Sequence, residues 1–450
     1  MSRSLTSRDL SPILSGLRAA NAALATGYPG DSGERQPVHT VYGGAHLFTA
    51  DTAPRLGAMA LASLDEFAPT TAMFAKALGL RVDQGFADTV RARVVDKLRR
   101  EPVEDFRLDF EDGYGNRPDA EEDGHARSAA GHVAAGMAAG TLPPFIGIRI
   151  KPMSKQLHGR SLRTLDLFVS ALMRAGKRRL PDHFAITIPK VMTPAHVVAV
   201  ARACAGLEQR LKLKPHSLQL ELMIETPQSI LAPDGTSALR GLVAAGGGRV
   251  RAAHFGTYDY TALCGITASW QQMRHPVCDF AKHMMQVALA HTGVFLSDGA
   301  TNVMPMALHK ASPGRPLTGL QRRENAATVH RAWKVHFDDV THSLVNGYYQ
   351  GWDLHPAQLP TRYAALYAFF LAARPAATAR LKNFIAKAAQ ATLVGDVFDD
   401  AATGQGLLNF FVRGLSSGAI TLDEARETGL TTEELQARTF LAILNARKGA

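Results

Sequence analysis

Two carboxylates in apolar surroundings are the side chains of this 450-residue chain best suited to chemistry. Glu225 closes the run Leu222-Met223-Ile224, and Asp259 follows Phe255-Gly256-Thr257-Tyr258. A carboxylate at the end of an apolar strand is costly unless it is paired or bound to a metal. On neighbouring strands, the two would suit Mg²⁺, and Mn²⁺ accepts the same oxygen ligands. The alternative is that Glu225 caps a helix beginning near Pro227 and Asp259 serves a turn.

Charged side chains also close other apolar runs. Glu111 and Asp112 follow the run that begins at Phe106. Arg149 closes the run that begins at Phe145, and Lys190 follows the run that begins at Phe184. Arg149 would present its planar fork to a substrate carboxylate, or pair with Glu111 or Asp112. Lys190 could form a Schiff base, but neighbouring carboxylates should keep its pKa high, which favours an electrostatic or structural contact.

Histidines and a basic loop add further candidates for substrate binding. His46 and His355 stand near the ends of two runs and could exchange protons or contact substrate, or could simply be buried and hydrogen-bonded. The loop Lys151–Arg163 carries five basic residues and could receive a phosphate or a carboxylate, or could be a solvated surface.

The elements that must position these residues alternate regularly along the chain. Helix-length segments separate eight β-rich runs, several of them continuously apolar, as parallel strands buried on both faces require. The predicted strands are Val38–Phe48, Phe106–Asp112, Phe145–Ile150, Phe184–Val191, Leu218–Thr226, Arg249–Tyr258, Val294–Asp298 and Tyr348–His355. The pattern predicts an α/β fold, a (β/α)₈ TIM barrel with its site at the carboxyl ends of the strands. An open doubly wound sheet is the alternative, but no G-x-G-x-x-G follows the first strand.

Three regions follow from this pattern. Residues 1–37 are predicted to form a docking helix and a linker, with Ser11 as the N-cap and Pro12 as the first helical residue. Residues 38–359 would form the barrel. Residues 360–450 are predicted to be a helical extension that serves as a lid or an oligomer contact.

Composition limits the classes of function. The net charge is +10, but basic residues are scattered and no nucleic-acid-binding motif occurs, so a nucleic-acid partner is not expected. No apolar stretch is long enough for a membrane span, and no membrane partner is expected. Three cysteines without C-x-x-C spacing indicate a reducing compartment, and we expect a cytoplasmic protein.

Six motifs occur in the order typical of one family: Leu108-Asp109-Phe110-Glu111-Asp112, Ile148-Arg149-Ile150, Ile188-Pro189-Lys190-Val191, Ile224-Glu225-Thr226, Phe255-Gly256-Thr257-Tyr258-Asp259 and Leu354-His355-Pro356-Ala357-Gln358. From about Val38 to Leu359, the chain resembles the HpcH/HpaI aldolase and citrate lyase beta-subunit group. Malyl-CoA lyases and malate synthases are more distant relatives of that group.

The resemblance implies a Mg²⁺-dependent carbon–carbon lyase or aldolase that acts next to the carbonyl of a 2-oxo acid through an enolate. It implies that Glu225 and Asp259 are metal ligands, that Arg149 contacts the oxyanion and carboxylate, and that Glu111 and Asp112 orient metal-bound water and Arg149. It also implies a helical tail, often from a neighbouring subunit of a homo-oligomer, that helps close the site. Asp399 or Asp400 would then be the general base; a turn cluster is the alternative.

The sequence departs from the family after the seventh strand, where Ser297-Asp298-Gly299-Ala300 replaces the usual Asp-Gly-Pro. This departure favours a free 2-oxo or hydroxy acid as substrate over a CoA thioester. Two other functions stay open. One is phosphoryl transfer or hydrolysis on a phosphoenolpyruvate-like substrate, with the phosphate held by the basic loop. The other is a non-catalytic binding barrel, which the joint presence of Arg149, Glu225 and Asp259 disfavours.

Overall fold

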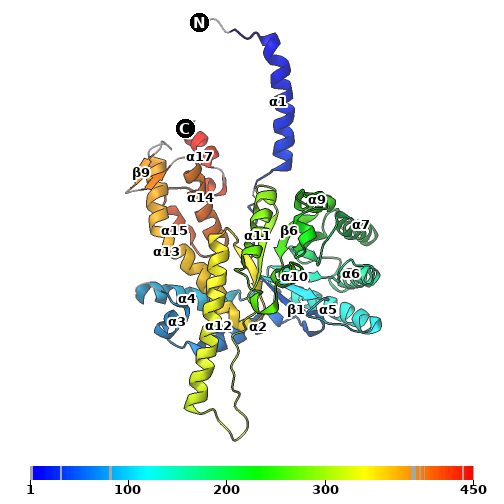
Figure 1. Ribbon diagram of the computed structural model, residues 1–450, viewed down its shortest axis with the longest axis vertical. Coiled ribbons are helices and arrows are strands. Elements are labelled where there is room, and N and C mark those ends of the chain that lie inside the picture. The colour runs from blue at the N-terminus through cyan, green and yellow to red at the C-terminus, as the bar shows by residue number, and fades with distance from the viewer. Residues whose placement is uncertain are drawn as a thin grey trace.

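A closed barrel of eight parallel strands forms the centre of the protein, and β8 pairs with β1 to close it. The computed structural model describes residues 4–30, 33–80, 84–386, 392–394, 397–399, 401–437 and 440–448. Figure 1 shows the barrel with helices around it and further helices beside it. The predicted (β/α)₈ barrel with a C-terminal helical extension is therefore confirmed. The strands are β1 (His39–Gly44), β2 (Asp105–Asp109), β3 (Phe145–Arg149), β4 (Phe184–Ile188), β5 (Gln219–Ile224), β6 (Val250–Phe255), β7 (Phe295–Ala300) and β8 (Gln350–Asp353).

Helices connect the strands and continue beyond the last one. They are α1 (Ser7–Gly27), α2 (Thr52–Phe67), α3 (Thr71–Leu78), α4 (Gln84–Arg100), α5 (Asp119–Ala139), α6 (His158–Ala175), α7 (Pro194–Leu211), α8 (Pro227–Ile230), α9 (Leu239–Ala245), α10 (Thr257–Leu263), α11 (Pro276–Leu289), α12 (Gly319–Val345), α13 (Leu359–Ala386), α14 (Ala401–Ser416), α15 (Leu422–Arg426), α16 (Thr432–Ala437) and α17 (Phe440–Lys448). Short 3₁₀ turns are η1 (Ala45–Leu47), η2 (Ala268–Trp270) and η3 (Pro356–Gln358), and β9 (Thr392–Val394) pairs with β10 (Val397–Asp399).

Alternation along β2 shows how the barrel is filled. Phe106 and Leu108 are buried on one side of the strand, whereas Asp105, Arg107 and Asp109 point to the other. Arg107 forms ion pairs with Asp105 and with Glu221 of β5 across the barrel interior. The interior is thus partly charged, whereas most such barrels are filled by branched apolar residues.

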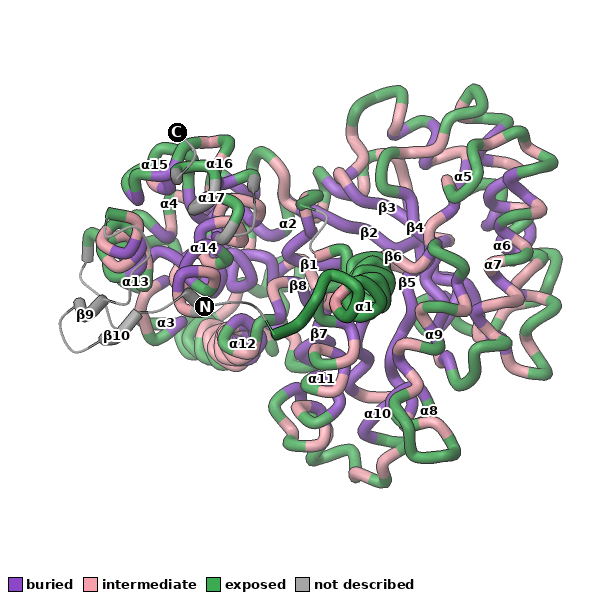
Figure 2. Tube along the Cα trace, turned by 90° about the horizontal axis from the view of Figure 1, so that it is seen from above, coloured by how far each residue is buried: buried purple, intermediate pink, exposed green. Residues whose placement is uncertain are grey.

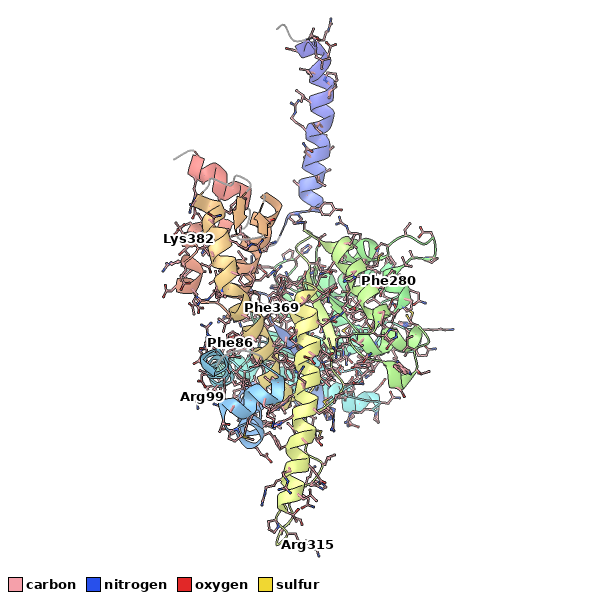
Figure 3. The ribbon with its side chains drawn as sticks, turned by 60° about the vertical axis from the view of Figure 1, so that its left-hand side comes forward. Phe86, Arg99, Phe280, Arg315, Phe369 and Lys382 are labelled. Atoms are coloured by element: carbon pink, nitrogen blue, oxygen red, sulfur yellow. The ribbon has the colours of Figure 1, made fainter. Side chains whose placement is uncertain are left out.

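The two ends of the barrel carry different parts of the chain. Gly30 N–H donates to the His291 carbonyl before β7, which places the base of α1 at the amino ends of the strands. Arg413 of α14 donates to Gln36, just before β1, so the C-terminal helices also lie at that end. Figure 3 shows Arg315, in the loop after β7, at the end of the molecule opposite to α1.

The helix α1 begins earlier than predicted. Thr6, not Ser11, is its N-cap, because Thr6 and Asp9 form a capping box in which each side chain accepts a hydrogen bond from the other residue's backbone. Pro12 consequently lies inside the helix instead of opening it. Among the described residues, no helix is both long and apolar enough to cross a membrane.

Candidate active site

Glu225 and Asp259 lie at the carboxyl ends of the neighbouring strands β5 and β6. Glu225 is 2% exposed and accepts a hydrogen bond from the Lys190 backbone N–H at 2.7 Å. Thr226, not Glu225, caps α8 by accepting a hydrogen bond from Ser229 N–H, so the capping alternative for Glu225 is wrong. Asp259 lies in the first turn of α10, and its side chain is 37% exposed. One carboxylate is therefore buried and the other faces solvent.

Lys190 connects the acids of three strands. Its ammonium contacts Glu111 closely and lies 3.2 Å from Asp112 and 3.5 Å from Asp259. Its backbone is left-handed, with a φ of 49°, a conformation that lysine rarely adopts. Burial would lower the pKa of Lys190, but Glu111 and Glu225 outweigh that effect and raise it above its ordinary range. Lys190 therefore acts as a fixed positive charge, which disfavours a Schiff-base role.

Arg149 is buried below this cluster and is held by two acids. Asp109 accepts hydrogen bonds from its Nε at 2.7 Å and from its Nη2 at 2.5 Å, and Glu111 lies 3.0 Å from its Nη1. Tyr42 and Trp352 place their rings 4.8 and 5.4 Å from the guanidinium carbon. The expected partner Glu111 is present, but Asp109 is the stronger partner because it accepts two hydrogen bonds. Arg149 therefore fixes the position of the acidic loop after β2, which carries Glu111 and Asp112.

Asp109 belongs to the cluster, although the strand-end pattern gives it no role of its own. Its carboxylate accepts hydrogen bonds from Glu111 N–H at 2.9 Å and from Gly113 N–H at 2.7 Å, in addition to those from Arg149. The register of β2 and β3 pairs Asp109 with Arg149 directly. The signal in the sequence was the alternation of Asp105, Arg107 and Asp109 with apolar residues, which directs all three into the barrel.

The cluster holds more negative than positive charge. Two cationic side chains, Arg149 and Lys190, lie among five carboxyl groups, those of Asp109, Glu111, Asp112, Glu225 and Asp259. Burial, followed by the charges of Asp259 and Glu111, raises the pKa of Glu225 to about 8. A carboxyl group this far from its ordinary range is typical of a functional site, and the surrounding negative charge would favour a bound cation here.

A divalent metal ion fits this charge imbalance. Glu225 and Asp259 would hold it through oxygen atoms, and Mg²⁺ commonly takes one or two carboxylates and keeps several waters. In the part of the chain that the structure describes, no group of three or more His, Cys, Asp or Glu side chains is arranged to bind a metal. Gly256 lies against Glu225, and a Cβ atom at position 256 would collide with the Glu225 carboxylate. Glycine is therefore required here for Glu225 to keep its observed position.

The remaining predicted residues lie around the cluster without joining it. His355 is the cap of η3, where Nδ1 accepts a hydrogen bond from Ala357 N–H at 3.2 Å, and burial lowers its pKa. Burial also lowers the pKa of His46, whose ring lies 5.4 Å from that of Tyr114. Asp298 lies inside β7, not at its end, and is paired outward with Lys282 at 3.0 Å.

Three of the five basic residues in the predicted loop Lys151–Arg163 are paired within the protein, and its residues from His158 onward belong to α6. Lys151 donates to the Phe110 carbonyl at 2.6 Å and lies 3.2 Å from Glu122. Arg160 and Arg163 each lie 2.5 Å from Asp123 of α5. The loop borders a cavity of about 410 Å³, which is lined by Glu111, Asp112, Gly115, Asn116, Lys151, Pro152, Leu157 and Lys190. This pairing leaves the phosphate-binding alternative without most of its cations.

The predicted lid does not cover this cluster within one copy of the chain. Asp399 ends β10, and Asp400 lies outside the described residues. The β9–β10 pair contacts α13 and α14, and Figure 1 shows these elements on the α1 side, away from the carboxyl ends of the strands. Asp399 could therefore serve as a base only for a neighbouring subunit, and the role of either aspartate as the base stays a prediction.

Comparison with known proteins connects this fold to citrate lyase. A citrate lyase from Burkholderia xenovorans LB400 is 18% identical, with a TM-score of 0.57 over 88% of this chain and 97% of that chain. CitE from Mycobacterium tuberculosis, in complex with magnesium, acetoacetate and coenzyme A, is 14% identical, with a TM-score of 0.45 over 86% of this chain and 99% of that chain. The magnesium and glyoxylate complex of Haloferax volcanii malate synthase is 14% identical, with a TM-score of 0.44 over 73% and 74% of the two chains.

These likenesses concern the fold, and the sequence itself supplies the family. The comparison with curated proteins finds no match. Residues 17–443 match the family described as a domain of unknown function, DUF6986. Because that match covers nearly the whole chain, the protein belongs to the DUF6986 family, here built on a (β/α)₈ barrel like that of citrate lyase.

Proposed function

We propose that this protein is a Mg²⁺-dependent carbon–carbon lyase or aldolase that acts on a free 2-oxo or hydroxy acid, with a CoA thioester as the less favoured substrate. The observation that carries the proposal is the excess of carboxylates around Lys190 at the carboxyl end of the barrel. The fold shared with citrate lyase is consistent with it.

Each side chain has a definite task in this proposal. Glu225 and Asp259 would hold Mg²⁺, which supplies Lewis-acid charge to the carbonyl and carboxylate oxygens of the substrate. Lys190 would face the negative charge that develops when the bond next to the carbonyl breaks. Arg149, through Glu111, would keep the acidic loop in place; direct contact between Arg149 and substrate stays a prediction.

The general base and the assembly complete the proposal. Asp399 or Asp400 of a neighbouring subunit would take the proton of the substrate hydroxyl in the cleavage direction. Residues 38–359 would be the catalytic unit of a cytoplasmic homo-oligomer, and residues 360–450 would supply the lid. Cys204 and Cys278 are buried and Cys264 is partly exposed, and all three are free thiols, as a reducing compartment favours.

Calorimetric titration with Mg²⁺, with and without pyruvate or oxaloacetate, tests the proposal. We expect the 2-oxo acid to tighten Mg²⁺ binding, and Asp259→Asn to abolish both Mg²⁺ binding and turnover of oxaloacetate. Asp65→Asn, on the exposed face of α2, is the matched control and should change neither. The circular dichroism spectrum should be the same in both variants. Full turnover by Asp259→Asn would refute the assigned role, and release of phosphate from phosphoenolpyruvate would favour phosphoryl chemistry.

A further inference from the structure

The helix α1 stands apart from the rest of the protein. None of its 21 residues is buried, and Ile13, Leu17 and Leu24 are 60%, 52% and 59% exposed. Figure 1 shows α1 projecting from the amino end of the barrel, and Figure 2 shows it exposed along its length. Its attachment is confined to its base, where Arg240 lies 4.4 Å from the Tyr28 ring.

A helix with this sequence needs a partner to be stable in water. Isolated helices of about 20 residues are marginal even when their sequences favour helix. In α1, Pro12 removes one backbone hydrogen bond, and Gly16 costs about 1 kcal/mol relative to alanine. The apolar side chains of α1 must therefore be covered for the helix to persist.

The spacing of those apolar side chains indicates that another helix packs against them. Residues Leu10, Ile13, Leu17, Ala20 and Leu24 recur at alternating intervals of three and four, which is the seam of a coiled coil. Leu14, which is 45% exposed, widens this stripe on one side, but α1 contains no aromatic residue, unlike helices that lie in a membrane surface. The seam itself is uncharged. Two copies of α1 can therefore face each other along this seam without repulsion between like charges.

The position of α1 sets the direction of pairing. Figure 2, viewed along α1, shows α1 in front of the barrel strands and the C-terminal helices to one side. Paired helices lie only about 8–10 Å apart, so a parallel pair would force the two barrels into the same space. An antiparallel pair separates the two bases by the length of the helix, about 31 Å. It also sets Leu17 against the partner's Ala20 at the centre of the pair, and Ile13 against the partner's Leu24 on either side of it.

We propose that α1 pairs with α1 of a second copy of this chain in an antiparallel homodimer. This contact joins the amino ends of two barrels. It is independent of the proposed enzymatic function and of any contact that brings Asp399 to a neighbouring site.

The mass of the full chain in solution tests the pairing. Light scattering after gel filtration should give a wild-type mass twice that of the Leu17→Glu variant, because this substitution places a charge in the middle of the seam. Ser15→Glu, also exposed but on the opposite side of α1, is the matched control and should keep the doubled mass. A wild-type monomer, or an unchanged mass for Leu17→Glu, overturns the proposal. The far-UV circular dichroism spectra of Leu17→Glu and Ser15→Glu should match, which verifies that the barrel is intact in both variants.

A disulfide test fixes the direction. In the double variant Ile13→Cys and Leu24→Cys, mild oxidation should join position 13 of one chain to position 24 of the other. The two positions in one helix lie about 16 Å apart, too far for a bond within the chain. Trypsin cuts at Arg18 and separates them, so mass spectrometry identifies the linked peptides. A bond from position 13 to position 13, or none between these positions, overturns the antiparallel arrangement.

Discussion

Binding of Mg²⁺ should expel a proton from Glu225, and the binding should tighten as pH rises. Glu225 is buried beside Asp259 and Glu111, which raises its pKa to about 8, so the metal-free protein keeps this carboxyl protonated at neutral pH. A metal ligand must be ionised, and the ion therefore competes with the proton for the same oxygens. We therefore compare Mg²⁺ binding at pH 7 with Mg²⁺ binding at pH 9.

The pKa gives the size of the effect. Glu225 is roughly 90% protonated at pH 7 and roughly 10% protonated at pH 9, since each pH unit changes the ratio tenfold. We therefore expect Mg²⁺ to release roughly 0.9 protons per ion at pH 7 and roughly 0.1 at pH 9. The apparent Kd should fall about tenfold over this range, which corresponds to about 1.4 kcal/mol.

Calorimetry in buffers with different ionisation enthalpies measures both quantities. Glu225→Gln cannot ionise and should bind Mg²⁺ weakly, with no proton release at either pH. Glu66→Gln, which changes an exposed glutamate of α2, should behave like the wild type. Tight binding at pH 7 with no proton release would refute the reasoning, because Glu225 would then be ionised already.

The same shift predicts how pH affects the folding free energy of the metal-free protein. The folded chain holds a proton on Glu225 that the unfolded chain loses above its ordinary pKa of 4.5. Stability should therefore fall as pH rises from about 4.5 to about 8, and Mg²⁺ added at pH 8 should restore it. Urea denaturation at pH 5, 6.5 and 8, with and without Mg²⁺, measures this trend, and a rise in metal-free stability that Glu225→Gln leaves unchanged would contradict the assignment.

Three further substitutions test the cluster. Lys190→Gln should tighten Mg²⁺ binding by about tenfold or more, because it removes a cation from the excess of carboxylates, and should lower turnover; calorimetry and an oxaloacetate assay would show both. Asp109→Asn should destabilise the fold by about 3–5 kcal/mol, because it leaves Arg149 buried with one fewer charge partner; urea denaturation measures the loss, and a change below about 1 kcal/mol would contradict it. Gly256→Ala should weaken Mg²⁺ binding, because the new methyl group would meet Glu225, and unaltered affinity would show that this carboxylate does not hold the ion.

The sequence determined the fold and the end of the barrel at which the candidate site lies. Eight apolar runs separated by helices predict eight parallel strands, and the structure has a strand within or overlapping each run, although most of them end before the predicted last residue. In such a barrel, residues just after the strands gather at one end whatever the details of packing. Lys190, Glu225 and Asp259 therefore met as expected, although they are far apart in the chain.

The tertiary structure decided which charged residues face one another. Asp298 and Asp109 both belong to strand ends in the sequence, but Asp298 points outward to Lys282 and Asp109 inward to Arg149. A shift of one residue along a strand reverses the direction of a side chain, and sequence patterns locate strand ends less accurately than that. The pairing of Arg163 with Asp123, and the position of Asp399 at the far end of the barrel, depend on how helices pack. Because those contacts join residues that are distant in the sequence, they cannot be predicted from the local pattern of apolar and charged residues.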